Sequence, residues 1–174
     1  MHPEQNVVLT GFMGTGKTSV GRRLALKLEM EFVDTDELIE SRHGPIPRIF
    51  AERGEEGFRA IEREVARELG TRSGLVIATG GRMILDPESF RSLSRNGRIF
   101  NLVATPEVIY QRIIGDKTPR DRPLLQVDDP RQRIVELLAE RDHEYARFHQ
   151  VPTDDADPGQ IADEIARLWR RPDG

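Results

Sequence analysis

The chain has 174 residues, of which 37% are hydrophobic and 32% are charged, a composition too apolar for a disordered chain and too polar for a membrane-embedded one. This length suits one domain with a substantial core. The formal net charge of −4 argues against a nucleic-acid partner, and the absence of cysteine excludes disulfides and thiolate zinc sites. Because the first residues do not resemble a targeting signal and no apolar stretch could span a bilayer, we expect a cytoplasmic protein without membrane contact.

Short apolar runs alternate with stretches of helical periodicity along the chain. The runs predict strands at residues 7–9, 32–33, 75–78 and 99–103, and such continuous apolar runs suit a parallel sheet covered on both faces. The periodic stretches predict helices around residues 20–28 and at residues 55–69, 106–114, 129–148 and 160–170. This alternation predicts an α/β fold, a three-layer α/β/α sandwich with a mainly parallel central sheet and right-handed crossovers.

The segment of residues 11–18 reads Gly-Phe-Met-Gly-Thr-Gly-Lys-Thr and matches the pattern G-x-x-x-x-G-K-[ST] between a predicted strand and a predicted helix. Glycines let backbone N–H groups close around phosphate oxygens, and the start of a helix adds partial positive charge. Lys17 can neutralise charge on the β- and γ-phosphates, and the Thr18 hydroxyl can coordinate Mg²⁺. A glycine-rich turn with a chance lysine is the alternative, which the flanking elements argue against.

We therefore predict a nucleotide site with Mg²⁺ as cofactor. ATP is a better candidate than GTP because the sequence has no Asn-Lys-x-Asp element of the kind that reads guanine. The predicted ATP-binding residues are Gly14, Thr15, Gly16, Lys17, Thr18 and Ser19.

Two carboxylates, Asp34 and Asp36, follow the second predicted strand directly, where they would face the phosphate loop from a neighbouring strand end. One could hold Mg²⁺ while the other orients an accepting hydroxyl. Capping of a helix amino terminus is the alternative role, and one carboxylate could serve both purposes.

Several segments in this order resemble the shikimate kinase family over essentially the whole chain. Beyond the phosphate loop and the two aspartates, they read Gly-Glu-Glu-Gly-Phe-Arg-Ala-Ile-Glu at 54–62, Ala-Thr-Gly-Gly at 78–81, Arg-Pro-Leu-Leu at 122–125 and Glu-Arg-Asp-x-x-Tyr at 140–145. The resemblance implies a P-loop NTPase fold of the nucleoside-monophosphate-kinase type. It also implies transfer of the γ-phosphoryl group of ATP to a ring hydroxyl of shikimate, giving shikimate 3-phosphate in the pathway of aromatic amino-acid precursors.

The same resemblance implies roles for individual residues. Arg59 and Arg141 match the family's carboxylate-binding arginines, and a guanidinium suits that task through paired N–H bonds. Asp36 matches the residue that binds the ring hydroxyls and positions the accepting one, which leaves Thr18 and Asp34 as the metal ligands. The implied substrate-binding residues are Asp36, Arg59, Gly80, Gly81 and Arg141.

A polar, charged segment at residues 115–123 does not fit a strand or a helix, and the stretch that resembles the family's lid motif, residues 122–125, begins at its end. The resemblance implies a lid at about residues 115–128 within a single domain of residues 1–174, and Arg122 matches the arginine that folds over ATP. A cation that arrives with a closing lid can stabilise the transferring phosphoryl group. The implied catalytic residues are therefore Lys17, Asp36 and Arg122, with Arg120 and Arg112 as weaker candidates for the lid and the adenine face.

Some alternatives stay open at this stage. Arg59 could pair with Glu55 or Glu62 on its own helix, and Arg141 could pair with nearby acids. The family usually has three glycines after the third strand, but this chain has Arg82 in the third position, and its side chain could enter the pocket or point outward. The alternative functions are a kinase for another small hydroxy acid, such as gluconate or quinate, and a non-catalytic ATP-binding regulator. We expect the protein to be a monomer.

Overall fold

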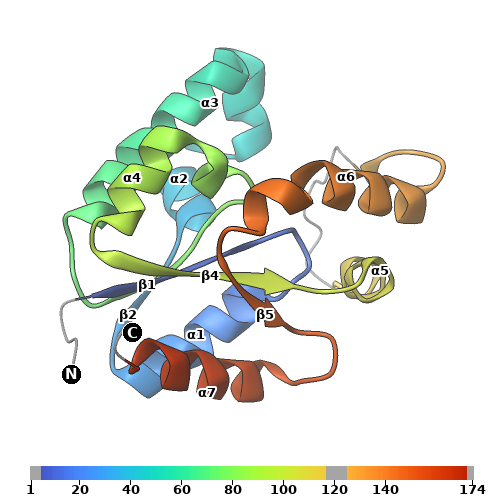
Figure 1. The fold of residues 1–174 in the computed structure, drawn as a ribbon. Coiled ribbons are helices and arrows are strands. Elements are labelled where there is room, and N and C mark those ends of the chain that lie inside the picture. The colour runs from blue at the N-terminus through green and yellow to red at the C-terminus, as the bar shows by residue number, and fades with distance from the viewer. Residues whose placement is uncertain (1–4, 117–124, 172–174) are drawn as a thin grey trace.

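The computed structural model describes residues 5–116 and 125–171. Its centre is a five-stranded sheet with the strand order β2-β3-β1-β4-β5, and every pair of neighbouring strands is parallel (Figure 1). The strands are β1 (Asn6–Gly11), β2 (Glu31–Asp34), β3 (Leu75–Ala78), β4 (Gly97–Val103) and β5 (His149–Pro152). The predicted α/β sandwich with a parallel sheet is confirmed.

One or more helices follow each strand. They are α1 (Lys17–Leu28), α2 (Thr35–His43), α3 (Ile46–Gly70), α4 (Pro87–Ser94), α5 (Pro106–Ile114), α6 (Pro130–Tyr145) and α7 (Pro158–Trp169), with a short 3-10 helix η1 (Met83–Leu85). No helix within the described ranges is long and apolar enough to cross a membrane.

Three apolar clusters hold the layers together. Figure 1 shows α1 and α7 on one face of the sheet, where Leu24 and Ile165 pack against Leu9 of β1. On the other face, α2, α3 and α4 cover β1 and β3 in a cluster that includes Val8 and Val65. A third cluster joins α5 and α6 to Phe12 of the phosphate loop.

Sequence periodicity missed α2, α4, β5 and the first part of α3. In β5, an edge strand, only Val151 is buried, so the segment has no apolar run to detect. In α2, only Thr35 and Ile39 are buried, which leaves little helical periodicity. The helix α3 begins before the predicted residue 55 and is kinked at Gly54, whose φ of 69° is a conformation that glycine adopts readily.

The topology places the carboxyl ends of β1, β2 and β3 side by side at one edge of the sheet. The segments that follow these strands are the phosphate loop, the Asp34–Asp36 turn and the glycine pair at residues 80–81. In parallel α/β sheets, ligands bind at this edge.

Candidate active site

The phosphate loop connects β1 to α1 through a backbone that needs its glycines. Gly11, Gly14 and Gly16 have φ values of 137°, 75° and 96°, which side chains rarely allow. A Cβ atom at Gly11 would also lie 2.4 Å from the carbonyl oxygen of Leu102 on β4. The tight turn predicted from the motif is therefore enforced both by conformation and by contact.

Side chains of the loop and of the start of α1 donate to carbonyl oxygens of the loop. The Thr15 hydroxyl donates to the Phe12 carbonyl oxygen at 2.7 Å. The Lys17 ammonium donates to the carbonyl oxygens of Gly11 (2.7 Å) and Phe12 (3.0 Å). No side chain of the described residues caps α1 at Gly16, so the first-turn N–H groups can donate to an anion.

A cavity of about 710 Å³ opens at this edge of the sheet. Its wall includes residues 14–19 of the phosphate loop and the start of α1, both carboxylates Asp34 and Asp36, the pair Gly80 and Gly81, and Arg141. Residues far apart in sequence that were predicted to serve one reaction therefore share one cavity. Arg59, the other predicted substrate-binding arginine, is not among the residues that line it.

Asp34 both caps a helix and meets the phosphate loop. Its Oδ1 atom accepts hydrogen bonds from the backbone N–H groups of Asp36 (3.0 Å) and Glu37 (3.2 Å), so the capping interpretation is correct for this residue. Its Oδ2 atom accepts from the Thr18 hydroxyl at 3.0 Å. A hydroxyl and a carboxylate oxygen are hard donors of the kind that Mg²⁺ prefers, so the two predicted ligands fit this ion.

Asp36 lies directly against the glycine pair. A Cβ atom at Gly80 would be 2.6 Å from the Asp36 Oδ1 atom, so any larger residue at position 80 would displace the carboxylate. The Gly80 N–H donates to the Thr35 hydroxyl at 2.9 Å, which ties this turn to the start of α2. The third strand and the second helix thus fix the carboxylate together.

Arg141 is a buried cation on α6 with a relative exposure of 7%. Burial lowers the pKa of its guanidinium, and the positive charges of Arg82 and Arg59 lower it further, whereas Tyr145 and Glu140 oppose the shift. Within the described residues, Arg141 forms no ion pair with a carboxylate. A buried cation without a counter-ion is unfavourable, and an anionic ligand in the cavity would remove that cost.

Arg59 forms the ion pairs that the alternative interpretation anticipated. Its guanidinium lies 2.6 Å from Glu62 and 3.5 Å from Glu55. Burial raises the pKa of Glu62 to about 7, Arg59 opposes this shift, and the nearby charge of Asp36 adds to it. The positive charge of Arg59 is also close enough to lower the pKa of Arg141, so both arginines belong to one electrostatic environment.

Arg82 replaces a glycine without backbone strain. Its φ of −122° and ψ of 0° do not require glycine. The side chain is exposed and does not line the cavity, which agrees with the outward interpretation. Its charge nevertheless adds to the lowering of the pKa of Arg141 and opposes the rise that burial causes in the pKa of Tyr145, so it adds to the positive potential at this end of the cavity.

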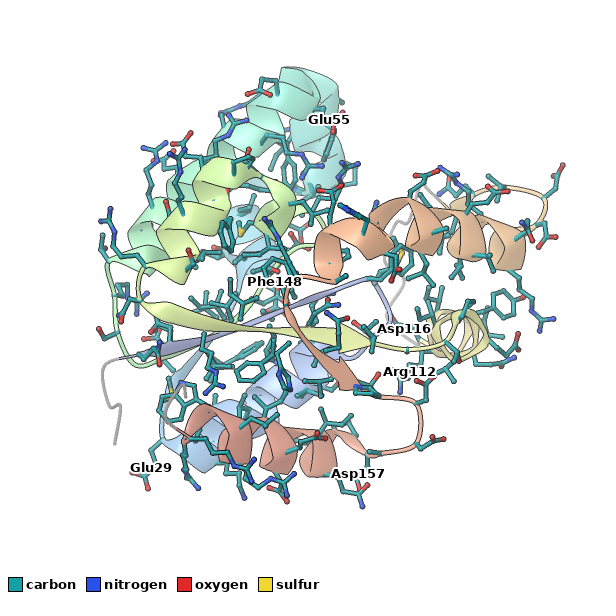
Figure 2. All side chains as sticks on the ribbon, in the orientation of Figure 1. Glu29, Glu55, Arg112, Asp116, Phe148 and Asp157 are labelled. Carbon is teal, nitrogen blue, oxygen red and sulfur yellow. The ribbon has the colours of Figure 1, made fainter. Side chains whose placement is uncertain are left out.

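At another part of the cavity wall, the side chain of Arg112 on α5 extends to the segment between β5 and α7 (Figure 2). Its guanidinium donates to the carbonyl oxygens of Gly14 (3.2 Å) and Thr153 (2.6 Å). The neighbouring acids have structural roles, because Asp154 accepts from the Thr105 N–H at 2.7 Å and Asp157 caps α7. The sequence could not show these contacts, because Gly14 and Thr153 lie 98 and 41 positions away from Arg112 in the chain.

The predicted lid lies largely outside the described residues. Arg120 and Arg122 both fall between the described ranges 5–116 and 125–171, so their predicted roles stay predictions.

Comparisons of the sequence and of the structure with known proteins point to the same family. Residues 13–169 match the family model described as "Shikimate kinase". The chain is 44% identical to the shikimate kinase of Caldanaerobacter subterraneus subsp. tengcongensis, with 95% of this chain and 96% of the relative aligned. It is also 44% identical to that of Thermus thermophilus, with 97% and 92% aligned. The structure of the Acinetobacter baumannii shikimate kinase in complex with shikimate superposes with a TM-score of 0.87 at 39% identity, covering 97% of this chain and 94% of that one.

Proposed function

The chain belongs to the shikimate kinase family and phosphorylates shikimate, and we propose that the cavity at the carboxyl ends of β1, β2 and β3 binds ATP and shikimate together. The observation that carries this proposal is the buried guanidinium of Arg141, which shares the cavity with the phosphate loop and has no carboxylate partner among the described residues. Shikimate brings a carboxylate that can serve as its counter-ion.

At the acceptor end, backbone groups support this assignment. The N–H groups of Gly81 and Arg82 donate to no protein acceptor in the described part of the chain, and they lie in the turn beside Arg141. A carboxylate can accept from such N–H groups and from a guanidinium at once. Arg59 joins this site once it exchanges its ion pair with Glu62 for the substrate carboxylate.

Asp36 is proposed to position the hydroxyl that attacks the phosphoryl group. Its carboxylate packs against Gly80. Because glycine has no side chain, the ring of shikimate could also approach the backbone there. A carboxylate that accepts a hydrogen bond from the hydroxyl orients the attacking oxygen and can accept its proton as the new bond forms. We propose the hydroxyl at ring position 3, which gives shikimate 3-phosphate.

At the donor end, the phosphate loop and the start of α1 are proposed to hold the triphosphate of ATP. Lys17 would leave its contacts with the loop carbonyl oxygens for the β- and γ-phosphates, where a cation offsets developing charge. Thr18 and Asp34 would hold Mg²⁺, which supplies further charge neutralisation when bound. Arg122 is proposed to reach the phosphoryl group from the lid.

The proposal is tested by measuring ADP release with Mg²⁺-ATP and a panel of acceptors: shikimate, quinate, gluconate and water alone. We expect turnover that saturates with shikimate, and ³¹P NMR of the product should show a phosphate ester at position 3. Turnover with quinate or gluconate but not shikimate would assign a different acceptor. Tight ATP binding without any acceptor-dependent turnover would indicate a non-catalytic protein. We further propose that one monomer of residues 1–174 carries the whole activity, which light scattering of the active protein can check.

A further inference from the structure

Tyr145 connects the helix that carries Arg141 to the glycine pair of the acceptor site. It lies on α6 one turn after Arg141, and its side chain has a relative exposure of 6%. Its hydroxyl donates a hydrogen bond to the carbonyl oxygen of Gly81, a residue 64 positions away in the sequence. Burial raises the pKa of the Tyr145 phenol, so the group stays a neutral donor at physiological pH.

This hydrogen bond fixes more than one atom of the turn. Because a peptide unit is planar, holding the Gly81 carbonyl also sets the direction of the Arg82 N–H in the same unit. A Cβ atom at Gly81 would lie 3.8 Å from the Nη1 atom of Arg141, so the guanidinium and this peptide are neighbours. The Tyr145 hydroxyl therefore fixes the Arg82 N–H relative to α6, the helix that carries the Arg141 guanidinium.

The end of α6 is in turn held to the sheet. The Gln150 side-chain amide on β5 donates to the carbonyl oxygens of Tyr145 and Phe148, both at 2.7 Å. Asn101 on β4 donates to the Gln150 side-chain oxygen at 2.8 Å. The position of Tyr145 is thus set by two strands of the sheet, which makes it a firm anchor for the turn.

We propose that Tyr145 is a positioning residue for the acceptor: through Gly81 it aligns the backbone donors with Arg141, so that a carboxylate meets them together. It touches neither shikimate nor the transferring phosphoryl group. The inference rests on the proposed function, since it concerns how that function's acceptor site is held. The proposal predicts an effect on acceptor binding that the ATP site does not share.

The test compares Tyr145→Phe with Tyr110→Phe in the full-length protein. Tyr110 is the other of the chain's 2 tyrosines, does not line the cavity, and packs under Arg131, whose Cζ lies 4.5 Å from the ring centre. We expect Tyr145→Phe to raise KM for shikimate about three- to tenfold, the loss expected for one hydrogen bond. KM for ATP and kcat should change less than about twofold, and Tyr110→Phe should leave all three constants near the wild-type values.

The outcomes separate this inference from the proposed function. If wild-type protein does not phosphorylate shikimate, the proposed function fails. If wild type is active and Tyr145→Phe lowers Tm but leaves KM for shikimate unchanged, Tyr145 is only a structural residue and the inference is overturned.

A spectroscopic titration covers the case in which Tyr145→Phe does not fold. In the Tyr110→Phe protein, Tyr145 is the only tyrosine left of the chain's 2. Shikimate should then perturb the near-UV tyrosine absorption, and the signal should saturate over the same concentration range as turnover. A flat tyrosine signal at saturating shikimate would overturn the inference.

Discussion

Replacing Glu62 with glutamine should remove a pH-dependent contribution to the stability of the fold. The Glu62 side chain is 3% exposed and lies 2.6 Å from Arg59. Its charged carboxylate therefore lacks most of the hydration that it has in the unfolded chain. Burial therefore raises its pKa from 4.5 to about 7. Glutamine keeps the size of the side chain and an acceptor oxygen for Arg59 but has no charge to bury.

The direction of the pKa shift of Glu62 determines how the stability of the fold changes with pH. The native state holds the Glu62 proton more tightly than the unfolded state, so the contribution of this proton is complete below pH 4.5 and is lost as the pH rises through about 7. With these two pKa values, the wild type should lose on the order of 2–3 kcal/mol relative to Glu62→Gln between pH 5 and pH 8.

Urea unfolding at pH 5, 6.5 and 8 measures this difference. Glu55→Gln is the matched control, because Glu55 also pairs with Arg59, at 3.5 Å, but its side chain is 68% exposed. We expect the pH profile of Glu55→Gln to run parallel to that of the wild type, while the profile of Glu62→Gln diverges upward as the pH rises. Parallel profiles for Glu62→Gln and wild type would contradict this expectation, since they would mean that Glu62 is charged at no cost in the native state.

Four further substitutions test the site. Lys17→Met should reduce kcat at least about 100-fold with every acceptor in the ADP-release assay, because the cation that offsets phosphate charge is lost; near-normal turnover would contradict this role. Arg59→Ala should raise KM for shikimate about tenfold with a smaller effect on KM for ATP, and unchanged saturation by shikimate would remove Arg59 from the acceptor site. Gly80→Ala should lower kcat/KM for shikimate at least about tenfold, because the new Cβ would lie 2.6 Å from the Asp36 Oδ1 atom, whereas equal efficiency would show that the carboxylate can move freely. Arg82→Gly should keep the preference for shikimate over quinate and raise KM for shikimate only a few-fold, because only a nearby positive charge is lost. Salt at 0.5 M should abolish this effect on KM. A changed preference would place the Arg82 side chain inside the pocket.

Much of the fold was predictable because its signals are local. The boundaries predicted for β3 match the structure, since Leu75–Ala78 is apolar throughout and buried on both faces. The helix α5 likewise matches its prediction, and the Thr105 hydroxyl caps it by accepting from the Val108 N–H. The elements that were missed, such as β5 and α2, bury too few residues to leave a periodic pattern.

The sequence predicted several of the residues that share the cavity, but not the contacts between them. The sequence order of the motifs placed Asp36, Gly80 and Arg141 in one site, and the cavity brings them together. The contacts that fix their geometry join residues from separate elements, such as Gly80 to Asp36 and Tyr145 to Gly81. No local pattern reports such contacts, because they depend on how α2, α6 and β3 pack in three dimensions.

The carboxylate of shikimate provides the most direct test of the role of Arg141. The ratio of kcat/KM for shikimate to kcat/KM for its methyl ester should be measured in the wild type and in Arg141→Ala. If the buried guanidinium of Arg141 receives the carboxylate, the wild type should prefer shikimate about 10- to 100-fold, and the substitution should remove most of that preference. An Arg141→Ala protein that keeps the wild-type ratio would show that Arg141 does not receive the carboxylate, because the carboxylate would then bind elsewhere.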